Sequence, residues 1–205
     1  MDPRQEHIHR LYAAELQFRL ASAVRLAVSM GKQPLDLPVQ WSHGSHVVEY
    51  KEIALRPDQA DFAAHGLQLS ATLLMAVAIR DGITAVIRDP KSDASPDVRA
   101  TYQISRMIRN AFAHGPTSPK WSIDDDCRDQ TFAVRDIITL DTRGLQGQPF
   151  DWRQYGGPLA LFRLCHFVRF EVLRDTSTKP TERSVDDPKI AYYQQGDLIL
   201  RKLDD

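Results

Sequence analysis

The stretch RMIRNAFAHGP, residues 106–116, places two arginines, an asparagine and a histidine near the end of an otherwise apolar segment. Residues four apart lie on one face of a helix, so Arg106, Asn110 and His114 form a row, and Arg109 flanks it. An arginine binds phosphate oxygens through a fixed fork of donors, and a histidine can carry a proton to or from a reacting group. These residue types, in this spacing, are suited to chemistry at a phosphate.

Two opposing effects act on His114. Gly115 and Pro116 end the helix, which puts His114 in its last turn, where the negative end of the helix dipole favours the imidazolium. The neighbouring arginines disfavour it, so we expect a histidine that titrates near neutral pH. The dipole alone also favours cationic residues at a helix end, and on residue types alone this simpler explanation of the cluster is the stronger one.

The positive charge near this stretch is local. Residues 96–120 contain four basic side chains and one acid, although the whole chain has a net charge of -1. The acidic run DDDCRD, residues 124–129, follows directly and limits the basic patch. The charge therefore argues against a broadly basic nucleic-acid coat and leaves a confined anion site. The four basic residues are Arg99, Arg106, Arg109 and Lys120.

Apolar residues at helical spacing, together with proline, glycine and serine at the expected ends, predict four main helices. The predicted helices cover residues 4–30, 57–88, 97–114 and 158–174, and Ser95 is the expected cap of the third. The first has a stripe of Ile8, Leu11, Tyr12, Leu16, Leu20, Val24 and Ala27. The inner face of the third consists of Ile104, Ile108, Ala111 and Phe112.

The segments between the helices contain the predicted β-structure. We expect a short strand over 46–55 after a loop at 31–45, and a hairpin within 117–143 from KWSI and QTFAVRDIITLDT. The fold class is therefore mainly α, a bundle of four main helices with a small β-hairpin appendage between the third and fourth. Residues 1–175 form this bundle, and 176–205 form a polar C-terminal extension in which a small hairpin around Gly196 fits the pattern.

The segment RNAFAH, residues 109–114, resembles the Arg-x4–6-His signature of the HEPN superfamily, where the residue after the arginine is typically polar, as Asn110 is. Proteins of that superfamily are helical bundles that place the motif on and just after the penultimate core helix. The order of two long helices, a motif helix and a final helix is similar here, and the resemblance covers residues 4–174. It implies a metal-independent endoribonuclease in a bacterial toxin or defence system.

The resemblance also implies a site. Arg109 and His114 become the catalytic residues and Asn110 supports them, while Arg106 and Lys120 are expected to bind RNA. The RNA 2′-hydroxyl would attack the adjacent phosphodiester, with no cofactor or metal. The cleft of such proteins usually lies between two copies, so a homodimer is expected, together with a cognate antitoxin protein as a further partner. The alternative is a non-catalytic HEPN-like module for dimerisation or partner binding.

Other chemistries lack their signatures. The histidines of HGSH, His43 and His46, lie three apart, but no HExxH occurs, and the acids at 124–126 lack the glycine and glutamate of a calcium loop. We therefore expect no metal. The chain has no dense cysteine framework, its first residues are charged, and its longest apolar run is too short to span a bilayer. A cytoplasmic protein without membrane contact is the expectation.

Overall fold

The computed structural model describes residues 3–32, 40–49, 54–113, 115–176, 190–195 and 198–203. Backbone contacts divide the chain into two compact units, Met1–Asp175 and Thr176–Asp205. Across the described residues, the first unit contains four α-helices and a two-stranded antiparallel sheet between the third and fourth. The mainly α fold class expected from the sequence is confirmed.

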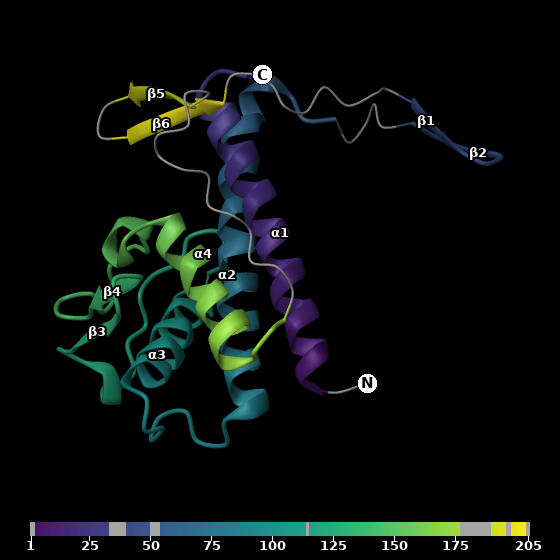
Figure 1. Cartoon of the computed structure of the whole chain (residues 1–205). Helices are drawn as coiled ribbons and strands as arrows, with labels where there is room; N and C mark the ends of the chain where they lie inside the picture. Colours follow the sequence, from purple (N-terminus) through teal and green to yellow (C-terminus); the bar gives the residue numbers. More distant parts are fainter. Residues whose placement is uncertain are drawn as a thin grey trace. The chain divides into compact units, whose positions relative to one another are not determined.

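The first two helices pack along each other as an antiparallel pair (Figure 1). Helix α1 covers Pro3–Ser29, and α2 covers Ala60–Val86 after the short 3₁₀ helix η1 at Pro57–Gln59. Proline at the first position of η1 needs no backbone N–H there, so it begins the segment without loss of a hydrogen bond. The shared core of the pair includes Leu11, Phe18, Met75, Ile79 and Ile83.

The apolar residues of α1 occupy two faces rather than one. The face toward the core consists of Ile8, Leu11, Ala14, Phe18 and Ala21. Three apolar residues of the predicted stripe point away from it, because Tyr12, Leu16 and Leu20 are 46 %, 43 % and 64 % exposed. Four-residue spacing places these three on one side of the helix, which we call the α1 outer stripe. Single-sequence periodicity did not separate the two faces.

Helix α3 covers Pro96–Ala111 and contributes the most amphipathic part of the core. The backbone N–H of Val98 donates to Ser95 Oγ at 3.3 Å, so Ser95 is the N-terminal cap that the sequence predicts. Ile104 and Ile108 are fully buried, again as predicted. The helix ends earlier than expected, at Ala111 instead of His114.

The segment between α3 and α4 packs onto α3 through its first strand (Figure 1). Strands β3, Thr131–Val134, and β4, Ile138–Asp141, form the antiparallel hairpin. Both strands lie within the second of the two predicted segments. KWSI contributes only the isolated bridge of Lys120 with Pro149. Short 3₁₀ helices, η2 at Asp125–Cys127 and η3 at Trp152–Tyr155, connect the hairpin to its neighbours.

Helix α4, Pro158–Phe167, continues into the π-helical turn η4, Val168–Val172, and closes the core against α1 and α2. Gly82 of α2 makes this closure possible. A Cβ atom there would lie 3.1 Å from Leu11 Cδ1 and 3.4 Å from Val168 Cγ1. A larger residue at this position would require the side chains of Leu11 and Val168 to shift.

Two further hairpins contain the remaining described strands. Strand β1, Gln40–His43, pairs with β2, His46–Glu49, so part of the predicted loop at 31–45 is a strand. In the second unit β5, Ile190–Gln195, pairs with β6, Leu198–Leu203. This hairpin agrees with the pattern in the sequence, and its predicted turn at Gly196 lies outside the described residues.

Both cysteines are buried, at separate places in the first unit. Cys165 lies in α4, where its thiol donates to the carbonyl of Leu11 at 3.8 Å, and burial raises its pKa. Cys127 lies at the end of η2, and burial is also the main cause of its raised pKa.

The segment Pro57–Val86 is long and apolar enough to cross a membrane by length and composition alone. One such helix does not indicate a membrane span, since the core helices of soluble proteins have the same length and apolar composition. In this structure 44 % of the most apolar 18-residue stretch of the segment is buried, and α2 contacts α1, α3 and α4.

Candidate active site at the end of α3

The end of α3 is fixed by a strand-like contact from the chain that follows. Phe112 N–H donates to Arg109 O at 3.1 Å, a three-residue bond that tightens the last turn. The carbonyl of Ala111, which would otherwise continue the helix, accepts from Lys120 N–H at 3.0 Å. The helical row predicted for Arg106, Asn110 and His114 therefore stops at Asn110, and His114 lies outside the described residues.

Arg109 is an exposed cation at this helix end. Its Nη1 donates to Asn110 Oδ1 at 3.2 Å, and Asn110 Nδ2 in turn donates to Asp124 Oδ2 at 3.1 Å. Among the described residues, no carboxylate forms an ion pair with Arg109. The guanidinium thus remains available to an anion while Asn110 and Asp124 limit its orientation.

Arg106, in contrast, is only 13 % exposed and is occupied by acids. Its Nη2 lies 2.5 Å from Asp126 Oδ1, and its Nε lies 3.2 Å from Asp124 Oδ2. Asp126 also binds Lys91 Nζ at 2.7 Å, and the hydrogen bonds from Lys91 and then Arg106 hold the pKa of Asp126 well below its usual value. The acidic run thus neutralises Arg106, and the predicted RNA contact at Arg106 remains a prediction.

Lys120 lies beside this helix end although it is nine residues beyond Ala111. Its backbone bond to Ala111 fixes that position, and its side chain is exposed. No carboxylate of the described chain pairs with the Lys120 ammonium. Arg109 and Lys120 are therefore two exposed cations on backbone segments that the same hydrogen bond joins.

The buried side chain of Phe112 fixes the segment 109–113 to the core. Its ring is buried and meets the ring of Phe150 edge to face, with 5.1 Å between centroids. Phe150 also contacts Trp121 at 5.1 Å, and its backbone N–H donates to Pro119 O at 3.0 Å. The buried indole of Trp121 donates to Gln154 Oε1 at 2.6 Å. This aromatic group links the end of α3 to the segment that precedes α4.

A second group of charged residues, absent from the sequence-based prediction, lies inside the bundle. Glu15 is fully buried, and its Oε2 accepts from Arg169 Nη1 at 2.6 Å. Arg169 also binds Asp175 at 2.7 Å, and its guanidinium lies 4.9 Å from the ring centroid of Tyr12. His166 Nε2 is 3.4 Å from Glu15 Oε2, without good hydrogen-bond geometry.

The Glu15 carboxylate stays ionised inside the core for an electrostatic reason. Burial alone raises its pKa, but the contacts with His166 and Arg169 outweigh burial, so the pKa lies below its ordinary value. One sequence signal pointed here: Ile8, Leu11, Glu15 and Phe18 follow the spacing of a buried face, with an acid at the third position. This buried group ties α1 to the turn after α4.

Among the described residues, no group of three histidine, cysteine or carboxylate side chains is arranged to hold an ion. The candidate site at the end of α3 therefore consists of the two exposed cations, Arg109 and Lys120, with Asn110 held by Asp124. No family model matches the chain, and no significantly similar curated protein or solved structure was found.

Proposed function

We propose that the protein is a metal-independent endoribonuclease whose active site includes Arg109, Asn110 and His114. The observation that supports this most directly is the state of Arg109. It is exposed, has no carboxylate partner among the described residues, and donates to Asn110, which Asp124 holds. A cation that served only the fold would be expected to be paired, as Arg106 is.

In this proposal the RNA supplies its own nucleophile. The 2′-oxygen bonds to the adjacent phosphorus while the bond from phosphorus to the 5′-oxygen breaks. His114 transfers the proton between the attacking hydroxyl and the leaving oxygen, and Arg109 stabilises the charge that develops on the phosphorane oxygens. The products are a 2′,3′-cyclic phosphate and a 5′-hydroxyl end.

Lys120 is the second RNA-binding residue in the proposal. Its side chain is exposed and its backbone is bonded to the end of α3, so we assign to its ammonium a phosphate next to the scissile one. Arg106 has a different role in this geometry, because its pairs with Asp124 and Asp126 orient the carboxylate that holds Asn110. We place the activity in the bacterial cytoplasm, in a toxin or defence system with a cognate antitoxin.

The direct test is gel analysis of end-labelled RNA with purified protein in EDTA. We expect slow cleavage that persists without divalent metal, and no cleavage of DNA of the same sequence. His114→Ala should lower the rate by about 10²–10⁴, the range for a lost general acid or base. Arg109→Ala should cost about 10²–10³ by loss of charge stabilisation.

Matched variants separate these effects from general damage. Arg88→Ala removes an exposed arginine near the end of α2, and His46→Ala removes an exposed histidine of β2. Both should cleave like the wild type. Equal cleavage by wild type and His114→Ala would indicate a contaminating nuclease and end the proposal. Intact RNA in every wild-type reaction would also end it.

The α1 outer stripe favours a second candidate function, a dimerisation module without catalysis. Tyr12, Leu16 and Leu20 present partly exposed apolar surface along one side of α1, although Arg169 lies over the Tyr12 ring. In a twofold dimer the same stripe can meet its own copy. A dimer is common to both candidates, since a nuclease of the proposed type is also expected to be a homodimer, so RNA cleavage and not assembly distinguishes them.

Light scattering tests this assembly. The wild type should have twice the mass of the 23.3 kDa chain at micromolar concentration. Leu16→Lys together with Leu20→Lys should shift it to monomer, whereas Leu159→Lys, on the exposed side of α4, should not. A wild-type monomer would contradict both the stripe interface and a site shared between two copies.

A further inference from the structure

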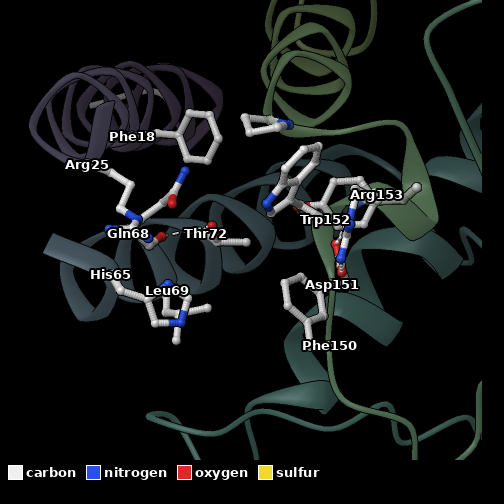
Figure 2. Close-up of a pocket in the computed structure, with 12 residues that line it drawn as sticks. Phe18, Arg25, His65, Gln68, Leu69, Thr72, Phe150, Asp151, Trp152 and Arg153 are labelled. Atoms are coloured by element: carbon white, nitrogen blue, oxygen red, sulfur yellow. Dashed lines mark hydrogen bonds and ion pairs between the residues drawn. The ribbon is translucent and has the colours of Figure 1, made fainter. Parts of the chain in front are cut away.

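A cavity of about 290 Å³ opens between the α1–α2 pair and the segment that precedes α4. Figure 2 shows Phe18 and Arg25 from α1 and the α2 residues on one side, with Phe150–Arg153 on the other. Its size is near the lower end of the roughly 300–1,000 Å³ usual for small-molecule sites. It therefore suits one ring system rather than a large ligand.

One wall of the cavity is aromatic, and it includes the indole ring of Trp152, which is only partly buried. Trp152 remains 38 % exposed, and none of the described residues accepts a hydrogen bond from its indole N–H. Gly157 lies against the back of this ring, where a Cβ atom would be 3.3 Å from Trp152 Cε3. The glycine thus leaves room for the indole against the backbone, while 38 % of the Trp152 side chain stays exposed.

The opposite wall contains polar side chains beside Phe18 and Leu69. Gln68 and His65 line it from consecutive turns of α2, and no hydrogen bond from the described residues engages the side-chain amide of Gln68. An amide offers paired donor and acceptor groups, which match the edge of a nucleobase. Two arginines flank the cavity: Arg25 pairs with Asp61, and Arg153 pairs with Asp151 and lies 6.0 Å from the Trp152 ring.

The cavity also adjoins the candidate active site. Phe150 lines the cavity and contacts Phe112, which follows Arg109 by three residues. One aromatic pair therefore separates the cavity from the motif. The segment that carries Phe150 thus contributes both to the cavity and to the packing under the end of α3.

We infer that this cavity binds a nucleobase of the RNA, stacked on Trp152, with its edge hydrogen-bonded by Gln68. This inference rests on the proposed function for the identity of the strand, but its binding chemistry is independent of cleavage. A free nucleotide has the same base and phosphate, so the test separates the two sources.

The test uses the full chain and probes that cannot be cleaved. Fluorescence anisotropy with labelled 2′-O-methyl hexamers of adenine and of uridine measures strand binding, and calorimetry with adenosine monophosphate measures the free nucleotide. Trp152→Ala should weaken hexamer binding by about 5- to 100-fold, the range for one lost stacking contact. Trp152→Phe should restore most of the affinity, which also excludes a folding defect.

The controls use residues outside the cavity. Phe62→Ala removes an exposed ring of α2 and should bind like the wild type. Gln68→Ala should reduce the difference in affinity between the adenine and uridine hexamers, while Gln17→Ala, an exposed amide of α1, should preserve it.

The outcomes distinguish this inference from the proposed function. Unchanged hexamer affinity in Trp152→Ala overturns the inference, even if the wild type cleaves RNA. Loss of affinity in a protein that never cleaves RNA supports the base site and removes the nuclease. Tight binding of adenosine monophosphate that the hexamers do not displace shows a free-nucleotide site and overturns the RNA assignment.

Discussion

Asn110 Nδ2 lies 3.1 Å from Asp124 Oδ2, and this contact places the polar residue of the motif under the control of the acidic run. The same carboxylate oxygen is 3.2 Å from Arg106 Nε. Asp124 therefore links the buried arginine of α3 to the exposed one, Arg109, through Asn110. The acidic run at 124–129, which limits the extent of the basic patch, therefore also positions Arg106 and Asn110 within it.

Asp124→Ala should lower RNA cleavage about tenfold, which corresponds to about 1.4 kcal/mol of lost transition-state stabilisation. The reason is that Asn110 loses its partner and no longer restricts Arg109. Asp125→Ala is the matched control, because Asp125 is 89 % exposed and forms an ion pair only with Arg128 among the described residues. Single-turnover rates of the two variants should differ, and equal rates would remove the role assigned to Asp124.

Arg106 and Lys120 should differ in the salt dependence of RNA binding. Lys120→Ala should reduce the slope of log affinity against log salt by about 0.7, the value for one phosphate contact on a single strand. Arg106→Ala should leave the slope nearly unchanged, since its charge is already neutralised by Asp124 and Asp126. Titrations at four salt concentrations measure this, with Lys32→Ala as an exposed control. A lower slope for Arg106→Ala would restore it as a direct RNA contact.

Glu15→Gln should destabilise the protein by about 3 kcal/mol, because it leaves the buried Arg169 with one fewer compensating charge. Glu6→Gln removes the acid of an exposed pair with Arg10 and should cost under about 0.5 kcal/mol. Denaturant unfolding compares the two. Similar costs would mean that the buried carboxylate contributes little beyond its packing.

The same carboxylate predicts a pH dependence of stability. Its pKa in the folded protein lies below the ordinary value of 4.5, so the unfolded chain takes up the proton first. The stability that the ionised form contributes is complete above pH 4.5 and is lost as the pH falls through the lower folded pKa. Melting temperatures between pH 7 and pH 3 should therefore fall less steeply for Glu15→Gln than for the wild type.

Phe112→Ala should cost about 3–5 kcal/mol, since the ring is buried and packs edge to face on Phe150. His114→Ala should cost well under that, because the proposal assigns His114 to catalysis and not to the fold. Phe62→Ala, which removes an exposed ring, is the control for loss of an aromatic residue. If thermal melts ranked His114 above Phe112, the histidine would belong to the fold rather than to a site.

Local patterns in the sequence predicted the helices well, and contacts between distant residues account for what they missed. The Ser95 cap and the buried Ile108 depend on neighbours within four residues, so single-sequence reasoning found them. The end of α3 depends on Lys120 N–H, and the pairing of Arg106 depends on Asp126, twenty residues away. Such partners are fixed by tertiary packing and leave no local periodicity.

The candidate site shows the same division. The sequence identified Arg109 and Asn110 by type and spacing, but it gave no measure of which arginine was free. Burial and ion pairing distinguish Arg109 from Arg106, although both are basic and three residues apart. The cavity was hidden for a similar reason, because Gln68 and Trp152 come from segments far apart in the chain.

The two buried thiols, Cys127 and Cys165, can report local opening of the structure through their reactivity. Cys165 is shielded by α1, and Cys127 lies under Arg106 at the acidic run, so each reacts with a thiol reagent only when its own surroundings open. Labelling rates at the two positions would then measure separate opening free energies without any introduced probe. A strand bound at the end of α3 would slow the modification of Cys127 and leave that of Cys165 unaffected.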